Sequence, residues 1–281
     1  MKNINWSELG FGYFKTDYNV RCEYKDGKWG ELYATEDVNM NIHMASTCLH
    51  YGQEVFEGLK AFRGADGKVR LFRVEENAKR MINSGEYLKM AVPSVELFTK
   101  ACIEAVKLNA DYIPPYGSGA SLYLRPMLIG VGPQVGVKPS ADYLFAVFVT
   151  PVGPYYKDGF NCIKVIIDYD HDRAAPKGTG HVKVGGNYAA SLDSGEIAHQ
   201  KGFASVIFLD PATKQYIDEC SAANFFGIRD GKYITPDSHS VLPSITNKSL
   251  RQIAEDLGLK VEQRKVGVEE LPTFSEAGCC G

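Results

Sequence analysis

The sequence predicts a mixed α+β protein made of two domains. Its 281 residues suffice for two domains of ordinary size. Helical patterns alternate irregularly with short apolar runs and hairpin signals, which favours α+β over a doubly wound parallel sheet. The stretch Pro151-Val-Gly-Pro154 is the best linker candidate. We therefore expect a smaller α/β domain over 1–150, a linker over 151–156 and a larger domain over 157–281.

Composition indicates an ordinary globular protein. Hydrophobic residues make up 44% and charged residues 23%, and the net charge is −3. This balance gives no electrostatic reason to expect nucleic acid or a membrane as partner. The N-terminus has no apolar signal region, and no apolar run reaches membrane-spanning length. The seven cysteines lack CxxC spacing, which is typical of reduced thiols. We expect a cytoplasmic protein without a metal site.

The N-terminal half contains the clearer helical patterns. Lys25-Asp-Gly-Lys28 is a hairpin signal, and 50–62 suits a short helix leading into a strand. Helices are predicted over 74–89 and 95–109, where apolar residues recur at helical spacing. Strands are predicted at 69–73, 121–131 and 142–150, with the last two as neighbours.

The C-terminal half shows the pattern of many short strands with a few helices. Helices are predicted at 188–201 and 249–257, and 268–277 is helix-like. The predicted strands lie at 162–168, 204–209, 215–218, 225–229, 232–235 and 259–265.

The most informative stretch is RAAPKGTGHVKVGGNYAA, which contains Lys183. The flanking Val182 and Val184 suggest an extended segment with the lysine on one face and the valines on the other. A poorly solvated amine there is a candidate nucleophile toward carbonyl compounds, with the phenol of Tyr188 nearby in sequence. A hairpin whose lysine reaches water explains this stretch alone equally well.

Three further features bear on that lysine. Glu219 lies in YIDECSAANFF, where short residues would let a flat ligand approach the backbone and the carboxylate could pair with a ring nitrogen. In SVLPSITNKSLR, a proline and hydroxyl residues precede a helix, as in phosphate sites. Arg73 ends a predicted short strand and could hold a phosphate. Taken singly, each is more often a surface carboxylate, an ordinary helix cap or a surface arginine.

Together, these groups match the needs of pyridoxal 5′-phosphate (PLP): an amine for its aldehyde, a carboxylate for its ring nitrogen, a phosphate cradle and a phenol. The chain also resembles the branched-chain amino acid aminotransferases of PLP fold type IV, nearly throughout and in order. The motifs that carry the resemblance are Tyr51-x4-Phe56-Glu-Gly-Leu-Lys-Ala61, VRLFR ending at Arg73, SLYLRP from Ser121, Lys183-Val-Gly-Gly-Asn-Tyr188 and Glu219-x4-Asn224.

The resemblance implies roles for individual residues. Lys183 would form the internal aldimine and shuttle the substrate proton, Glu219 would keep the pyridine nitrogen protonated, and Tyr188 would bind the ring hydroxyl. Arg73, Ile245 and Thr246 would hold the phosphate. The positions that match the family's substrate pocket are Phe14, Tyr51, Phe56, Tyr123 and Ala222, and Arg125 with Tyr123 would accept the second carboxylate of glutamate.

The implied activity is transfer of the amino group of L-Leu, L-Ile or L-Val to 2-oxoglutarate by a ping-pong mechanism, in a homodimer or a higher homo-oligomer. Family members continue after the equivalent of Glu276-Ala-Gly278 with a Gly-Thr-Ala turn that contacts phosphate and substrate. We therefore expect the domain to be truncated at its end. The alternatives are an inactive PLP-fold binding protein, a fold-type-IV lyase and a D-amino acid aminotransferase.

Overall fold

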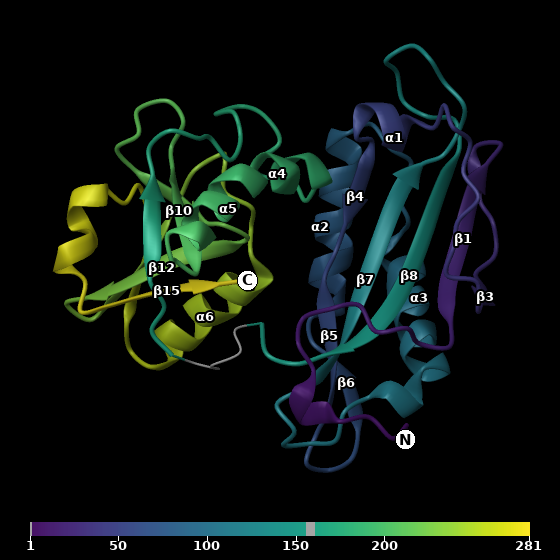
Figure 1. The fold of residues 1–281 in the computed structure, drawn as a ribbon, viewed down its shortest axis with the longest axis horizontal. Helices are drawn as coiled ribbons and strands as arrows, with labels where there is room; N and C mark the ends of the chain where they lie inside the picture. The colour runs from purple at the N-terminus through teal and green to yellow at the C-terminus, as the bar shows by residue number, and fades with distance from the viewer. Residues whose placement is uncertain (1, 156–160) are drawn as a thin grey trace. The chain divides into compact units, whose positions relative to one another are not determined.

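The computed structural model describes residues 2–155 and 161–281. The chain divides into two compact units, Met1–Asn161 and Cys162–Gly281, and each is sheet-based (Figure 1). The α+β class predicted from the sequence is confirmed, because both units combine a mainly antiparallel sheet with a few helices.

The first unit is organised on an eight-stranded sheet of order β2-β1-β8-β7-β5-β6, with β3 paired to β1 and β4 paired to β7. All of its strand pairs are antiparallel. The predicted neighbours at its centre pair along their whole length, from Ser121↔Val152 to Gly130↔Tyr143. The strands are β1 Asn19–Lys25, β2 Lys28–Trp29, β3 Tyr33–Thr35, β4 Glu54–Phe56, β5 Leu59–Arg63, β6 Val69–Leu71, β7 Ser121–Gly130 and β8 Tyr143–Val152.

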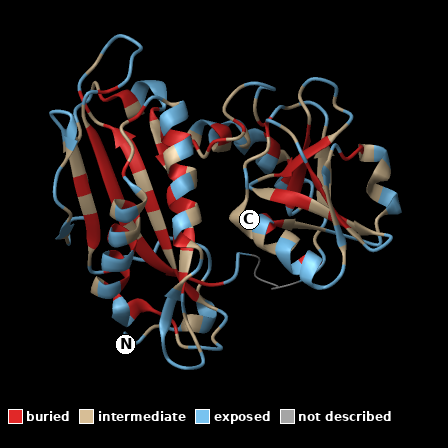
Figure 2. Ribbon diagram, turned by 180° about the vertical axis from the view of Figure 1, so that it is seen from behind, coloured by how far each residue is buried: buried red, intermediate tan, exposed pale blue. Residues whose placement is uncertain are grey.

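Helices α2 (Val74–Tyr87) and α3 (Val95–Leu108) cover one face of this sheet (Figure 2). Their buried positions recur at helical spacing, as the sequence predicts, and include Met81 and Phe98. The ring of Phe98 stacks on Phe145 of β8 at 5.8 Å between centroids. Shorter helical segments are α1 (Thr47–Tyr51), Trp6–Glu8 and Ala110–Tyr112.

The second unit has a seven-stranded mixed sheet of order β14-β13-β12-β11-β10-β9, with β15 paired to β12. The β9/β10 and β13/β14 pairs are parallel and the others antiparallel. Its strands are β9 Val165–Asp168, β10 Ser205–Leu209, β11 Ile217–Cys220, β12 Ala223–Arg229, β13 Lys232–Pro236, β14 Lys260–Arg264 and β15 Glu276–Cys280, and its helices are α4 Gly185–Ala190, α5 Leu192–Gln200 and α6 Ile245–Asp256.

Strand β10 has both of its faces buried, which explains its continuous apolar run. Val206 and Phe208 pack with Ala198 of α5 on one side. Ile207 and Leu209 join a larger cluster on the other side, covered by the 3-10 segment Val268–Thr273. Because side chains alternate along a strand, helix α5 and the 3-10 segment must lie on opposite faces of the sheet.

The linker prediction is wrong at its first residues. Strand β8 runs through Pro151 and Val152, which pair with Leu122 and Ser121 of β7. Pro151 is tolerated there because β1 pairs only with residues 143–147 of β8, so no second strand among the described residues pairs with this end. Of the remaining predicted linker, residues 153–155 form no helix or strand, and residue 156 lies outside the described residues.

Three helix predictions also need correction. The helix expected at 188–201 is two helices, α4 and α5, that meet at Ser191. Helix α6 begins at Ile245, four residues earlier than expected, because the Ser244 side chain accepts a hydrogen bond from Asn247 N and caps it. The helix-like stretch 268–277 is a 3-10 helix followed by strand β15, which pairs with β12.

Candidate active site

Lys183 lies outside the named strands, in the segment that leads into α4, and the next residue, Val184, has an extended backbone. The alternation still holds, because Val182 and Val184 are buried whereas Lys183 is partly exposed. The Lys183 Nζ donates to the phenol oxygen of Tyr188, one turn along in α4, at 2.6 Å. The two reactive groups that the sequence places five residues apart therefore meet in space.

A hydrogen-bonded clamp fixes the turn around Lys183. Asn187 Nδ2 donates to the carbonyls of Thr179 (2.7 Å) and Val182 (3.0 Å), and Thr179 Oγ1 donates to Asn187 Oδ1 at 2.7 Å. Gly180 lies against Ser240, and a Cβ there would lie 2.4 Å from the Ser240 carbonyl oxygen. Only glycine permits this approach, so the segment is held close to the loop after β13.

Glu219 is a buried carboxylate on β11, only 3% exposed, and not the surface group that a lone glutamate usually is. Its Oε1 accepts hydrogen bonds from Leu242 N and from Asn224 Nδ2, and its Oε2 lies 3.5 Å from the Nε of Arg173. Burial raises the pKa of Glu219 to about 7, although the charge of Arg173 opposes the shift. The positive charge of Lys183 also acts on this carboxylate.

A chain of buried amides joins Glu219 to the start of α6. Asn224 Oδ1 accepts from Asn247 Nδ2 at 3.1 Å, and Asn247 accepts from the Tyr233 hydroxyl at 2.8 Å. Asn247 lies in the first turn of α6, beside Ile245 and Thr246. The Thr246 hydroxyl donates to the carbonyl of Gly281 at 2.7 Å. The predicted ring-nitrogen partner and the predicted phosphate residues of this unit are thus parts of one framework.

Ala222 lies in the two-residue turn between β11 and β12. Its neighbour Ser221 has a left-handed backbone with φ 46°. The Ser221 hydroxyl accepts from Val206 N at 3.1 Å, which fixes the turn to β10. Ala222 is exposed.

Arg73 is predicted to end a short strand, but strand β6 stops two residues earlier, at Leu71. It is the N-cap residue of α2 and has a left-handed backbone with φ 50°. Such a conformation is uncommon for a residue with a Cβ and is found more often at functional positions. Its guanidinium lies over the ring of Phe72 at 5.7 Å.

Three of the predicted substrate residues come together in the first unit. The guanidinium of Arg125 lies 4.8 Å from the ring centroid of Phe56 and 5.4 Å from that of Tyr123. Arg125 Nη2 donates to the Tyr123 hydroxyl at 3.2 Å. The Tyr123 hydroxyl lies against Gly58, where a Cβ would be 2.1 Å away, so this packing requires glycine.

A buried ion pair holds this group in place. Glu57 is fully buried and accepts from Arg80 of α2 at both carboxylate oxygens, at 2.8 Å each. Asn77 Nδ2 donates to the same carboxylate at 2.8 Å. Because Glu57 lies between Phe56 and Gly58, the pair fixes the bend from β4 to β5.

The remaining two predicted substrate residues lie elsewhere in this unit. The Tyr51 hydroxyl donates to the carbonyl of Val135. The Phe14 N–H donates to Thr150 Oγ1 at 2.8 Å, and its ring meets Tyr112 edge-on.

Sequence reasoning missed three residues that the structure places at these groups. Arg173 and Asn187 contact or position Glu219 and Lys183, but a lone arginine or asparagine carries no chemical signal in a sequence. Lys60 pairs with Tyr123 across β5 and β7, and burial lowers its pKa. The signal for Lys60 was a lysine inside an apolar strand.

Comparison with known proteins identifies the family. The family model for amino-transferase class IV matches residues 54–281. A branched-chain-amino-acid aminotransferase of Haemophilus influenzae is 52% identical over all of this chain and 84% of the relative, and one of Helicobacter pylori gives the same values. The chain belongs to the branched-chain-amino-acid aminotransferases of class IV.

Solved structures agree with this assignment of the aminotransferase. The Escherichia coli branched-chain amino acid aminotransferase superposes with a TM-score of 0.77 at 28% identity, covering 95% of this chain and 83% of the other. The T.th. branched-chain amino acid aminotransferase, solved with pyridoxamine 5′-phosphate, gives 0.77 at 26% identity and the same coverage. The prediction that this chain is a PLP-dependent enzyme is confirmed. Among the described residues, no helix is long and apolar enough to cross a membrane.

The residues of the second unit fit PLP. The cofactor needs an amine, a carboxylate for the ring nitrogen and donors for phosphate. Lys183, a buried Glu219 and the capped start of α6 meet these needs within one hydrogen-bonded unit.

Proposed function

We propose that this aminotransferase moves the amino group of L-Leu, L-Ile or L-Val to 2-oxoglutarate by a ping-pong mechanism, releasing a branched 2-oxo acid and glutamate. The observation that carries the proposal is the Lys183–Tyr188 contact at 2.6 Å in the unit that also buries Glu219. The names of the relatives support the substrate class.

We assign the cofactor contacts as follows. Glu219 pairs with the pyridine nitrogen, because a carboxylate with pKa near 7 ionises readily once a positive partner faces it. Tyr188 binds the ring hydroxyl. The phosphate is held by Ile245 and Thr246 at the start of α6 and by Arg73. When bound, PLP supplies an electrophilic aldehyde and an electron-withdrawing ring.

Lys183 moves the proton. In its unprotonated form, Lys183 Nζ accepts the proton from Cα of the amino acid and later returns a proton to the 2-oxo acid partner. The clamp made by Asn187 keeps this amine in one place. Between proton transfers, Lys183 Nζ donates a hydrogen bond to the phenol oxygen of Tyr188.

Substrate selection must serve both an apolar and an acidic side chain. We assign the apolar contacts to Phe14, Tyr51, Phe56, Tyr123 and Ala222. Arg125, held by Tyr123, accepts the second carboxylate of glutamate, because a planar guanidinium is suited to a carboxylate.

We further propose that the enzyme is a homodimer or a higher homo-oligomer and works in the cytoplasm. Light scattering of the purified protein and fractionation of the source cells test the two statements separately. A monomer, or recovery in an organelle or membrane fraction, contradicts them.

Borohydride reduction followed by peptide mass mapping tests the central assignment. A pyridoxyl adduct on Lys183 is expected, and Lys164 and Lys177 should carry none. An adduct on another lysine would refute the role of Lys183 without affecting the family assignment.

A substrate panel tests the reaction. Conversion of L-Leu, L-Ile and L-Val with 2-oxoglutarate is expected. Conversion of D-Ala but not L-Leu would favour a D-amino acid aminotransferase, and binding without turnover would favour the inactive binding protein.

A further inference from the structure

A cavity of about 420 Å³ in the second unit is lined by none of the residues assigned to the cofactor or the substrate. Its floor includes the buried residues Ile217, Asp218 and Ser240. Its rim includes the exposed residues Asp237, His239 and Lys265. A volume of this size is within the range of small-molecule sites.

The floor carries a carboxylate with unused hydrogen-bonding capacity. Asp218 is only 4% exposed, and within the described part of the chain its Oδ1 has no hydrogen-bond partner. The Ser238 hydroxyl interacts with the carboxyl group, but burial still raises the pKa of Asp218. A buried carboxylate oxygen without a donor is costly, so the site favours a ligand that brings one.

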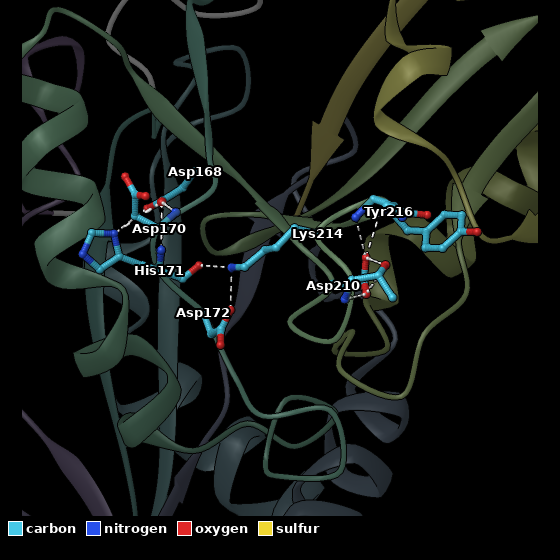
Figure 3. A network of polar contacts seen from close by, with 9 residues as sticks. Asp168, Asp170, His171, Asp172, Asp210, Lys214 and Tyr216 are labelled. Carbon is cyan, nitrogen blue, oxygen red and sulfur yellow. Dashed lines mark hydrogen bonds and ion pairs between the residues drawn. The ribbon is translucent and has the colours of Figure 1, made fainter.

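The neighbouring Asp210 does not compete for that ligand. Its Oδ1 accepts from the backbone N–H groups of Gln215 (3.0 Å) and Tyr216 (2.8 Å), and its Oδ2 accepts from Thr213 N at 2.8 Å. Figure 3 shows this carboxylate turned into its own loop. Asp218 is therefore the acceptor on the cavity floor.

The chemistry of the lining argues for an organic cation. Within the described residues, no group of three or more His, Cys, Asp or Glu side chains could hold a metal ion. The remaining walls are largely apolar, with Pro211, Ala212 and the Tyr216 ring. An ammonium group that carries a small apolar body satisfies both Asp218 and these walls.

We propose that this cavity binds a small organic ammonium ligand, with the Asp218 carboxylate accepting its N–H. The ligand could be a simple amine or an amino acid, and the residues at the rim distinguish the two. Lys265 Nζ lies 4.7 Å from the ring centroid of Tyr216, both at the cavity, and can pair with the carboxylate of an amino acid.

Such a ligand would influence the active site through β11. Asp218 directly precedes Glu219, and successive residues of a strand point to opposite faces. The negative charge of Asp218 contributes to the raised pKa of Glu219. A cation bound at Asp218 would offset that charge and favour the ionised form of Glu219.

Calorimetric titration of the holoenzyme with pyrrolidinium and with L-proline tests the proposal. Both probes are secondary ammonium ions and therefore poor amino donors. Asp218→Asn should weaken the binding of both by about tenfold or more, since it removes the charge of the acceptor. Asp230→Asn, in an exposed turn of the same unit, should change binding by less than about twofold.

The two probes distinguish the sources. Tighter binding of L-proline that Lys265→Met abolishes indicates an amino acid, and equal binding indicates a simple amine. If Asp218→Asn does not fold by circular dichroism, Ala212→Trp at the rim replaces it and should also weaken binding. The proposal is overturned if neither probe binds the wild type, as when water alone fills the cavity, or if the folded variant binds as the wild type does.

Discussion

In the second unit Lys183 and Glu219 are buried or held by hydrogen-bonded neighbours, whereas in the first unit the candidate substrate residues are partly exposed, and Phe56, Tyr123 and Arg125 form an aromatic face. Glu219 is 3% exposed and is joined through Asn224 and Asn247 to α6. Tyr51 and Phe14, by contrast, are 40% and 37% exposed. A cofactor that is the same in every turnover is best held by rigidly positioned residues. Substrates with different side chains are better served by partly exposed residues that can adjust.

The largest effect is expected from removing the amine of Lys183 in the second unit. Lys183→Ala should lower the transamination rate by more than about a thousandfold, because it removes both the nucleophile and the base. The variant should fold, since Asn187 and not Lys183 clamps the turn. Steady-state kinetics and circular dichroism check this. The exposed Lys177→Ala is the control, and normal turnover of Lys183→Ala would contradict the assignment.

The first unit also has one rigid element, the buried pair beneath its aromatic face. Arg80→Met leaves Glu57 buried without its cation and should cost about 3–5 kcal/mol of the free energy of unfolding. Chemical denaturation measures the change. Arg70→Met removes an exposed pair with Asp66 and should have little effect. Equal losses in both variants would show that Glu57 does not anchor this face.

The buried carboxylate of the second unit should make the cofactor-free protein sensitive to pH. The pKa of Glu219 in the fold is about 7, above its ordinary value of 4.5, because burial disfavours the charged form. The folded state therefore holds the proton more tightly, and stability falls as pH rises from about 4.5 to about 7, by up to about 3 kcal/mol.

Unfolding of the apoprotein followed between these pH values measures that loss. Glu219→Gln stays neutral throughout and should remove this part of the pH dependence. If the free energy of unfolding of Glu219→Gln depends on pH as strongly as that of the wild type, another group is responsible. The burial of Glu219 then destabilises the apoprotein less than expected.

The smallest effect is expected from a change in the aromatic face of the first unit, at Arg125. Arg125→Met should raise the KM for 2-oxoglutarate by about tenfold, through loss of one charged contact, and change the KM for L-Leu much less. Lys107→Met, exposed in the last turn of α3, is the control. An equal rise for both substrates would mean that Arg125 supports the face and does not select the acidic side chain.

The local elements could be predicted because local patterns encode them. Helices α2 and α3 follow from apolar residues at helical spacing, and the Asp26-Gly27 hairpin follows from its turn residues. The five motifs of the resemblance, those around Lys183 and Glu219 among them, likewise sufficed to indicate the family. The predictions failed where pairing with a distant strand decides the structure. Pro151 belongs to β8 because it pairs with β7, and residues 276–280 form a strand because they pair with β12.

The sequence by itself determined which residues to expect at the site: the amine of Lys183, the carboxylate of Glu219 and the guanidinium groups of Arg73 and Arg125. Only the tertiary structure decided their environments. Burial, the contact with Arg173 and the raised pKa make Glu219 more than a surface carboxylate. Burial and electrostatic fields arise from residues far apart in the chain, so no local pattern in the sequence can carry them.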